Sequence, residues 1–143
     1  MAADVKLDLD DLFRKIIGEV GNRDYVIAVS NKTGAALRRV DAYNDSQDWP
    51  LFDMEPGESA GKLRSVSFSF AAKYEGGGHT FVLAASSPFA GHNKIDLSTT
   101  DTSCKSVWDK MDDGHDKSTP GGSRAAIMTD THGAKFWYFE LKG

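Results

Sequence analysis

The sequence predicts a mainly β fold: an antiparallel β-sandwich of about 7 to 10 strands, flanked by an N-terminal amphipathic helix and a second short helix. Three observations support this fold class. Residues 9–20 have the periodicity of a helix, and the apolar runs after Gly21 have strand length and are separated by turn residues. The connections between these runs are short, which favours antiparallel pairing. We expect one domain over residues 1–143, with the helix in 1–21 and the sandwich in 22–143.

The predicted first helix has one apolar face. Its apolar residues lie at offsets 0, 3, 4, 7, 8 and 11, the spacing of a single helix face. They are Leu9, Leu12, Phe13, Ile16, Ile17 and Val20. Gly21 is a typical residue just after a helix. Such a helix either packs on the sandwich or buries its apolar face in a lipid bilayer, and the periodicity alone leaves both possibilities open.

The first half of the predicted sandwich begins with a hairpin. Residues 25–29 form a short apolar run, residues 31–34 are a turn, and residues 35–43 are predicted as the returning strand. Residues 44–61 are rich in proline, glycine and aspartate and are predicted as a loop. Within residues 63–70, apolar side chains alternate with serines, which predicts a strand with one buried and one hydroxyl-rich face.

The second half contains further strands and the short helix. Strands are predicted over residues 80–86 and 94–98, and a terminal hairpin over 124–130 and 134–141. The last of these strands carries aromatic residues on both faces, so we expect it to be central in a sheet. Residues 103–112 are predicted as a short helix capped by Thr102 or Ser103, and residues 116–122 as a turn-rich connection.

Composition excludes several functional classes. The net charge of −4 gives no basic surface for nucleic acid. The single cysteine rules out an internal disulfide, and no apolar run approaches the ~20 residues that cross a bilayer. The first residues lack the basic leader of a signal peptide. We therefore expect a soluble chain without a signal peptide.

Catalytic and metal-binding patterns are weak. The four histidines each adjoin a glycine and are scattered, which indicates surface turns. The acidic residues between 109 and 116 do not fit a calcium-binding EF-hand, because Met111 and Pro120 stand where oxygen ligands belong. Cys104, alone at a helix start, is more typical of an inert thiol than of a nucleophile. We expect no enzyme activity, no cofactor and no metal.

A series of short motifs follows a recognisable order. They are Gly21-Asn22-Arg23, Asn31-Lys32-Thr33-Gly34, Tyr43 with Ser46, Pro56-Gly57, Ser86-Ser87-Pro88-Phe89, and Val107-Trp108-Asp109-Lys110-Met111. Together with the leading helix and the cysteine-poor sandwich, this order resembles the actinoporin family of pore-forming cytolysins. The resemblance covers most of the chain, although each motif is short.

The resemblance implies a membrane-acting toxin. In that family the sandwich docks on a lipid headgroup, the N-terminal helix detaches and inserts, and several copies line a pore. Carried over to this chain, it assigns the apolar stripe of residues 9–20 to insertion and predicts a soluble monomer that homo-oligomerises on membranes. It also implies that the chain is secreted or released to act at a target-cell membrane, with cytoplasmic storage as the alternative. The positions that match the family's headgroup site are Ser46, Ser86, Pro88, Phe89 and Trp108.

The chain departs from the family at its aromatic residues. Residues 90–94 contain none, and Asp112 and Asp113 stand where the family has a tyrosine pair. Quaternary ammonium groups are held by such rings, so the departure points to a headgroup other than phosphocholine. The alternative is a non-lytic carbohydrate- or lipid-binding sandwich similar to fungal fruit-body lectins or aegerolysins. In that case exposed rings would stack on a sugar: Tyr43, Trp49, Tyr74 or Trp108.

Overall fold

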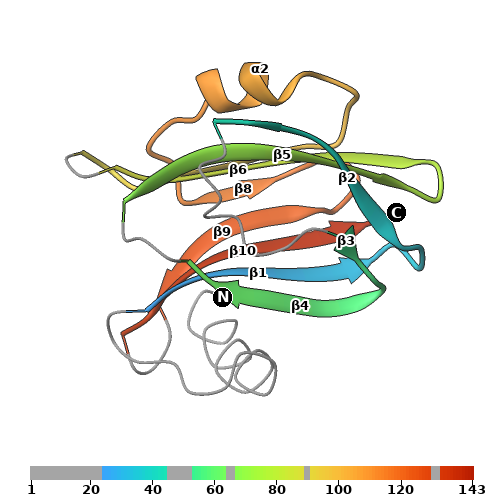
Figure 1. The fold of residues 1–143 in the computed structure, drawn as a ribbon, viewed down its shortest axis with the longest axis horizontal. Helices are drawn as coiled ribbons and strands as arrows, with labels where there is room; N and C mark the ends of the chain where they lie inside the picture. Colours follow the sequence, from blue (N-terminus) through green and yellow to red (C-terminus); the bar gives the residue numbers. More distant parts are fainter. Residues whose placement is uncertain (1–23, 45–52, 64–66, 89–90, 130–132) are drawn as a thin grey trace.

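The computed structural model describes residues 24–44, 53–63, 67–88, 91–129 and 133–143. In this part of the chain, ten strands form two five-stranded sheets that face each other, and a single helix lies on the outer side of one sheet (Figure 1). The β-sandwich and its second short helix are therefore confirmed. The predicted helix over residues 9–20 lies outside the described residues.

The two sheets have equal numbers of strands but different neighbours. Sheet A contains, in spatial order, β4 (Gly57–Lys62), β1 (Tyr25–Lys32), β10 (Lys135–Lys142), β9 (Arg124–Thr129) and β8 (Asp116–Ser118). Sheet B contains β3 (Asp53–Met54), β2 (Leu37–Tyr43), β5 (Phe68–Gly76), β6 (His79–Ser87) and β7 (Lys94–Ser98).

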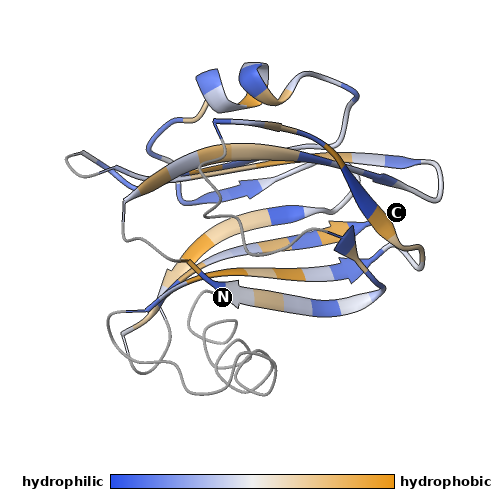
Figure 2. Cartoon of the chain, viewed as in Figure 1, coloured by the Kyte–Doolittle hydropathy of each residue, from blue (hydrophilic) through white to orange (hydrophobic). Residues whose placement is uncertain are grey.

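The core lies between the sheets and is rich in aromatic side chains. Alternate residues of each strand point inward, as the period of two requires. Trp137 and Phe139 of β10 meet Phe68, Phe70 and Tyr74 of β5 there. Figure 2 shows the hydrophobic colour concentrated along β1, β9 and β10 and along parts of β5 and β6. Tyr74 is 0% exposed, so the expectation that it stacks on a sugar is wrong.

One strand pair in sheet A is parallel. β1 and β10 run side by side in the same direction, from the pair Tyr25 and Lys135 to the pair Lys32 and Lys142. The expectation of purely antiparallel pairing is therefore wrong. That expectation used connection lengths, which constrain only strands that are neighbours in sequence. β10 is nevertheless central in its sheet, as its aromatic residues on both faces predicted.

The predicted hairpin over residues 25–43 does not form. β1 belongs to sheet A, whereas β2 pairs with β3 and β5 in sheet B. The connection between them is the expected turn: Asn31 Oδ1 accepts hydrogen bonds from Thr33 N (3.1 Å) and Thr33 Oγ1 (2.7 Å), and Gly34 has a φ of +83°. The turn chemistry was readable from sequence, but it carries the chain between sheets instead of back along one sheet.

Three short strands lie where loops were predicted. β3 lies within residues 44–61, β4 begins within them and ends at Lys62, and β8 lies within 116–122. The sequence of β4, Gly-Glu-Ser-Ala-Gly-Lys, has no β-branched or aromatic residue, so it carries no strand signal. In contrast, the strand predicted over 63–70 is recorded as β5, which begins at Phe68 and continues to Gly76.

The short helix and the terminal hairpin are confirmed. Helix α2 (Cys104–Asp109) begins after Ser103, whose side chain accepts a hydrogen bond from Ser106 N at 3.1 Å. It packs on the outer face of sheet B, where Cys104 and Val107 contact a small apolar cluster that includes Ala71, Val82 and Ala84. β9 and β10 form the predicted hairpin.

Candidate functional site

Three polar residues form a line across the outer face of sheet B. Ser69 of β5 is the register partner of Ser86 of β6, and Ser86 is the partner of Lys94 of β7. Their sequence neighbours Phe70, Ala85 and Ile95 belong to the core between the sheets. Because side chains alternate along a strand, Ser69, Ser86 and Lys94 face outward, and we call them the polar row.

Helix α2 brings an aromatic ring to the polar row. Trp108 Nε1 donates a hydrogen bond to Ser69 Oγ at 2.8 Å. The Trp108 ring meets the ring of Tyr43 edge to face, with centroids 5.3 Å apart, and both residues are half-buried. Next to Tyr43, Asn44 Nδ2 donates to the backbone oxygen of Ser69 at 2.9 Å. An indole, a phenol and two serine hydroxyls thus gather beside one end of sheet B.

The hydroxyl of Ser86 is the distinctive group in this arrangement. Ser86 is only 6% exposed, yet its Oγ has no hydrogen-bond partner in the described part of the chain. An unsatisfied buried polar group costs about 1–3 kcal/mol, so such groups are usually paired with water, an ion or a ligand. Lys94, its half-buried neighbour, likewise has no ion-pair partner among the described residues. The polar row therefore offers two donors to an external molecule.

The predicted headgroup residues are only partly placed by the structure. Ser86 and Trp108 lie at the polar row, and half-buried Pro88 follows two residues after Ser86, just beyond the end of β6. Ser46 and Phe89 lie outside the described residues. Sequence reasoning missed Lys94 as a member, because its position beside Ser86 depends on the register between β6 and β7. The serine alternation before Phe70 was the available signal for Ser69.

The outer face of sheet A is apolar. Its cluster contains Val26, Ala28, Ala126, Met128, Ala134, Phe136 and Tyr138, with Ala60 packed against it. These seven residues are at most 7% exposed, although the one described helix, α2, packs on sheet B. We call this cluster the sheet A apolar face. The predicted inserting residues, Leu9 to Val20, lie outside the described residues. No described helix is long and apolar enough to cross a membrane.

Three of the acidic residues between 109 and 116 form ion pairs with cationic side chains. Lys105 contacts Asp109 at 2.7 Å, Lys117 contacts Asp112 at 2.6 Å, and Arg124 contacts Asp116 at 2.8 Å, each distance joining a nitrogen to a carboxylate oxygen. The hydrogen bond from Lys117 holds the pKa of Asp112 below its usual value. Among the described residues, no group of three or more histidine, cysteine, aspartate or glutamate side chains is placed to hold a metal ion.

The single cysteine is in its protonated form at neutral pH. Burial against sheet B raises the pKa of Cys104 to about 11, with the nearby Asp41 carboxylate adding to the shift. A thiol with this pKa is a poor nucleophile, because the thiolate is the reactive form. The structure therefore agrees with the prediction of an inert Cys104.

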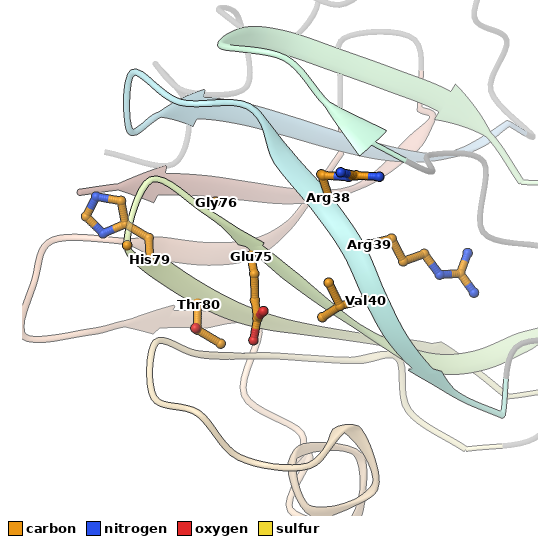
Figure 3. Close-up of a pocket in the computed structure, with 8 residues that line it drawn as sticks. Arg38, Arg39, Val40, Glu75, Gly76, His79 and Thr80 are labelled. Carbon is orange, nitrogen blue, oxygen red and sulfur yellow. The ribbon is translucent and has the colours of Figure 1, made fainter.

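An open pocket of about 620 Å³ lies at the opposite end of sheet B (Figure 3). It is lined by Arg38, Arg39, Val40, Glu75, Gly76, Gly78, His79 and Thr80. Val40 is 51% exposed and lies at a break in the register between β2 and β5, which falls between Arg39 and Asp41. In Figure 3 the side chains of Val40, Glu75 and Thr80 point to one side, whereas Arg38 and Arg39 extend away from them. The charged groups do not converge on a common point, so this pocket makes a weaker site than the polar row.

Comparison with known proteins finds similar solved structures but no family. No family model matches the chain, and no curated protein matches it. One of these solved structures is a methionine-substituted variant of the Xerocomus chrysenteron lectin XCL. It shares 10% sequence identity, covers 84% of this chain and 99% of its own, and has a TM-score of 0.44. A likeness of this size supports no conclusion about ligand or activity.

Proposed function

We propose that the protein is a non-catalytic membrane-binding protein. In this proposal the polar row and Trp108 bind a phosphate-bearing lipid headgroup, and residues 9–20 then enter the bilayer. The observation that carries the proposal is the buried hydroxyl of Ser86, which has no hydrogen-bond partner in the described part of the chain and lies between Ser69 and Lys94.

The residues of the site suit both charges of a zwitterionic headgroup. A phosphate oxygen accepts hydrogen bonds, and Ser86 Oγ and Lys94 Nζ are donors on adjacent strands. A choline or ethanolamine cation favours the face of an aromatic ring. The Trp108 ring, which bonds to Ser69 and contacts the Tyr43 ring, is next to the polar row. Lys105 Nζ, however, already lies 5.8 Å from the Tyr43 ring centroid, so we assign the cation to Trp108.

The sheet A apolar face supports the second part of the proposal. Its side chains are buried without a described helix above them, and the stripe from Leu9 to Val20 ends shortly before β1 begins on that sheet. We infer that the stripe covers this face in water. From Val5 to Val20, 16 residues span roughly 24 Å as a helix, slightly less than the roughly 30 Å hydrocarbon core. A bilayer offers the stripe a second apolar environment.

The headgroup site is tested by sedimentation with vesicles. Vesicles that contain phosphatidylethanolamine are compared with vesicles of phosphatidylcholine and sphingomyelin, which share the phosphocholine headgroup. Each is tested with the native chain, Ser86→Ala and Thr80→Ala. Thr80 is the matched control, because it is on the same strand at its other end and at an even spacing from Ser86. We expect Ser86→Ala to weaken vesicle binding about tenfold, the effect of one hydrogen bond to a charged group. Equal binding of all three chains contradicts the headgroup assignment.

A glycan is the second candidate ligand, favoured by the half-buried Trp108 beside the serine hydroxyls. Indole faces stack on sugar rings, and hydroxyl groups pair with sugar hydroxyls. A glycan array distinguishes the two ligands. Sugar binding that Ser86→Ala weakens, together with no vesicle binding by the native chain, supports the glycan and contradicts the membrane proposal.

A further inference from the structure

The outer edge of sheet A has a regular arrangement of backbone groups. β4 is the edge strand and pairs antiparallel with β1, and Leu63 N donates to Tyr25 O at 2.8 Å one residue beyond β4. In an antiparallel pair, alternate residues bond to the partner strand. The odd-numbered residues of β4, which alternate with the same phase as Leu63, therefore bond to β1. The even-numbered residues Glu58, Ala60 and Lys62 direct their N–H and C=O groups away from the sheet.

These edge groups are unpaired in the described part of the chain. No backbone hydrogen bond to them is recorded on the outer side of β4, and Glu58 and Lys62 are exposed. An exposed edge strand is a template for pairing with another strand. β4 contains no proline, and its central residues Ser59, Ala60 and Gly61 are small, so a neighbouring backbone can approach.

We propose that the β4 edge pairs with the β4 edge of a second copy of this chain. The two strands run antiparallel and are centred on Ala60, which lies opposite Ala60 of the second copy. Glu58 then faces Lys62 of the second copy, and Lys62 faces its Glu58. Each of the three facing pairs uses two outward-directed hydrogen bonds, so about six backbone hydrogen bonds join the copies.

Charge complementarity selects this register. A two-fold interface places the same surface on both sides. When the axis passes through Ala60, Glu58 of each copy therefore faces the oppositely charged Lys62 of the other copy. Sliding the strands by two residues one way places Lys62 opposite Pro56, which has no N–H to donate. Sliding by one residue places outward-directed groups opposite residues that already bond to β1. Only the centred register pairs both the backbone groups and the charges.

Lys62 retains the freedom to make this contact. Its Nζ lies 3.3 Å from Asp24 Oδ2, and its side chain is 41% exposed. An ammonium group has three donors, so one ion pair leaves others available. The even-numbered residues of β4 share the side of sheet A that carries Ala60 and the sheet A apolar face. The pairing therefore places the apolar faces of the two copies on the same side of one continuous ten-stranded sheet.

Charge reversal tests the register with the full chain. Sedimentation equilibrium is measured for the native chain, E58K, K62E and the double variant E58K/K62E. We expect the native chain to dimerise in solution, in contrast to the soluble monomer that the actinoporin resemblance implies. Each single reversal places like charges opposite each other twice and weakens dimerisation roughly tenfold or more, whereas the double variant restores it. A mixture of E58K with K62E associates as strongly as the native chain, because their charges are complementary.

Two results overturn the proposal. The first is a native chain that remains monomeric at all concentrations, and the second is a dimer whose dissociation constant the single reversals do not change.

A disulfide across the interface provides a second measurement. Ala60→Cys places two thiols across the axis with Cα atoms about 5.5 Å apart, within disulfide range. We expect covalent dimer on mild oxidation, and none for the control Thr80→Cys on sheet B. Absence of cross-linking in a native dimer contradicts the Ala60 centre.

Discussion

The two outer faces of the sandwich differ in what covers them. The outer face of sheet B carries helix α2, which begins at a serine cap and presents Val107 and Cys104 to the sheet. The sheet A apolar face is larger and includes Phe136, Met128 and Tyr138, yet no described helix lies on it. The outer face of sheet B is thus covered by helix α2, which packs beside polar groups. For the sheet A apolar face, we propose that residues 9–20 provide the cover.

In our proposal, this difference separates ligand binding from membrane insertion. The polar row lies on the face with the fixed helix, so a ligand there contacts a surface that does not need to rearrange. The stripe from Leu9 to Val20 contributes only apolar contacts to our proposed packing, and such contacts are not directional. The stripe can therefore exchange its contacts with the sheet A apolar face for contacts with lipid tails. Lipid tails cannot, in contrast, substitute for the hydrogen bond between Trp108 and Ser69.

The largest expected effect is on the free energy of unfolding, which should fall more for a substitution in the sheet A apolar face than for one on the outer face of sheet B. Phe136→Ala removes a side chain that is 1% exposed and should lower the free energy of unfolding by about 3–5 kcal/mol. Val107→Ala on the α2 side should cost about 1–3 kcal/mol, because fewer carbon atoms are removed. Urea unfolding measures both.

The proposed packing of the stripe on the sheet A apolar face also predicts coupling between Ile16 and Phe136. In an Ile16→Ala background, Phe136→Ala should lower the free energy of unfolding by less than it does in the native chain. Strict additivity of the two changes contradicts contact between the stripe and this face.

A smaller effect is expected at Trp108. Trp108→Ala removes the contact with Tyr43 and leaves Ser69 Oγ without its donor, so we expect a loss of about 2 kcal/mol for this half-buried residue. Trp108→Phe keeps a ring beside Tyr43 and should lose about 1 kcal/mol. Thermal unfolding provides the comparison. Equal losses for the two variants contradict the role given to ring packing.

The smallest effect concerns acid stability. The hydrogen bond from Arg124 holds the pKa of Asp116 below its usual value. A group whose pKa is lowered in the folded state stabilises the fold above its unfolded pKa, about 3.9, and loses this contribution as pH falls through the folded pKa. Because the Asp116 side chain is 57% exposed, we expect Asp116→Asn to cost at most about 0.5 kcal/mol at pH 7. The difference from the native chain should vanish in acid, as followed by unfolding at pH 7 and pH 3. A difference that persists in acid excludes the ion pair as its cause.

Local signals in the sequence predicted the elements well, and their pairing poorly. The alternation of serines with Phe68 and Phe70, the cap at Ser103 and the two-faced aromatic strand β10 all follow from periodicity or side-chain chemistry. β4 was missed because its small and charged residues have no strand propensity, and it forms through backbone pairing with β1. The crossing from sheet A to sheet B after Asn31 depends on tertiary packing.

The candidate site shows the same division. The matched segments identified Ser86 and Trp108, which the structure brings to the polar row. Ser69 and Lys94 joined them only through the registers between β5, β6 and β7, which a single sequence does not contain. The lack of a partner for the Ser86 hydroxyl among the described residues is likewise a property of packing, which a single sequence does not contain.

Dye release from vesicles tests the central claim most directly. The native chain, Ile16→Asp and the control Lys15→Ala are added to vesicles of phosphatidylcholine and sphingomyelin. Ile16 belongs to the apolar stripe and Lys15 to the opposite face. We predict that the native chain and Lys15→Ala release dye, and that Ile16→Asp binds the vesicles without releasing it. A native chain that releases no dye from vesicles of any lipid composition, or an Ile16→Asp variant that releases dye as fast as the native chain, would contradict insertion of residues 9–20.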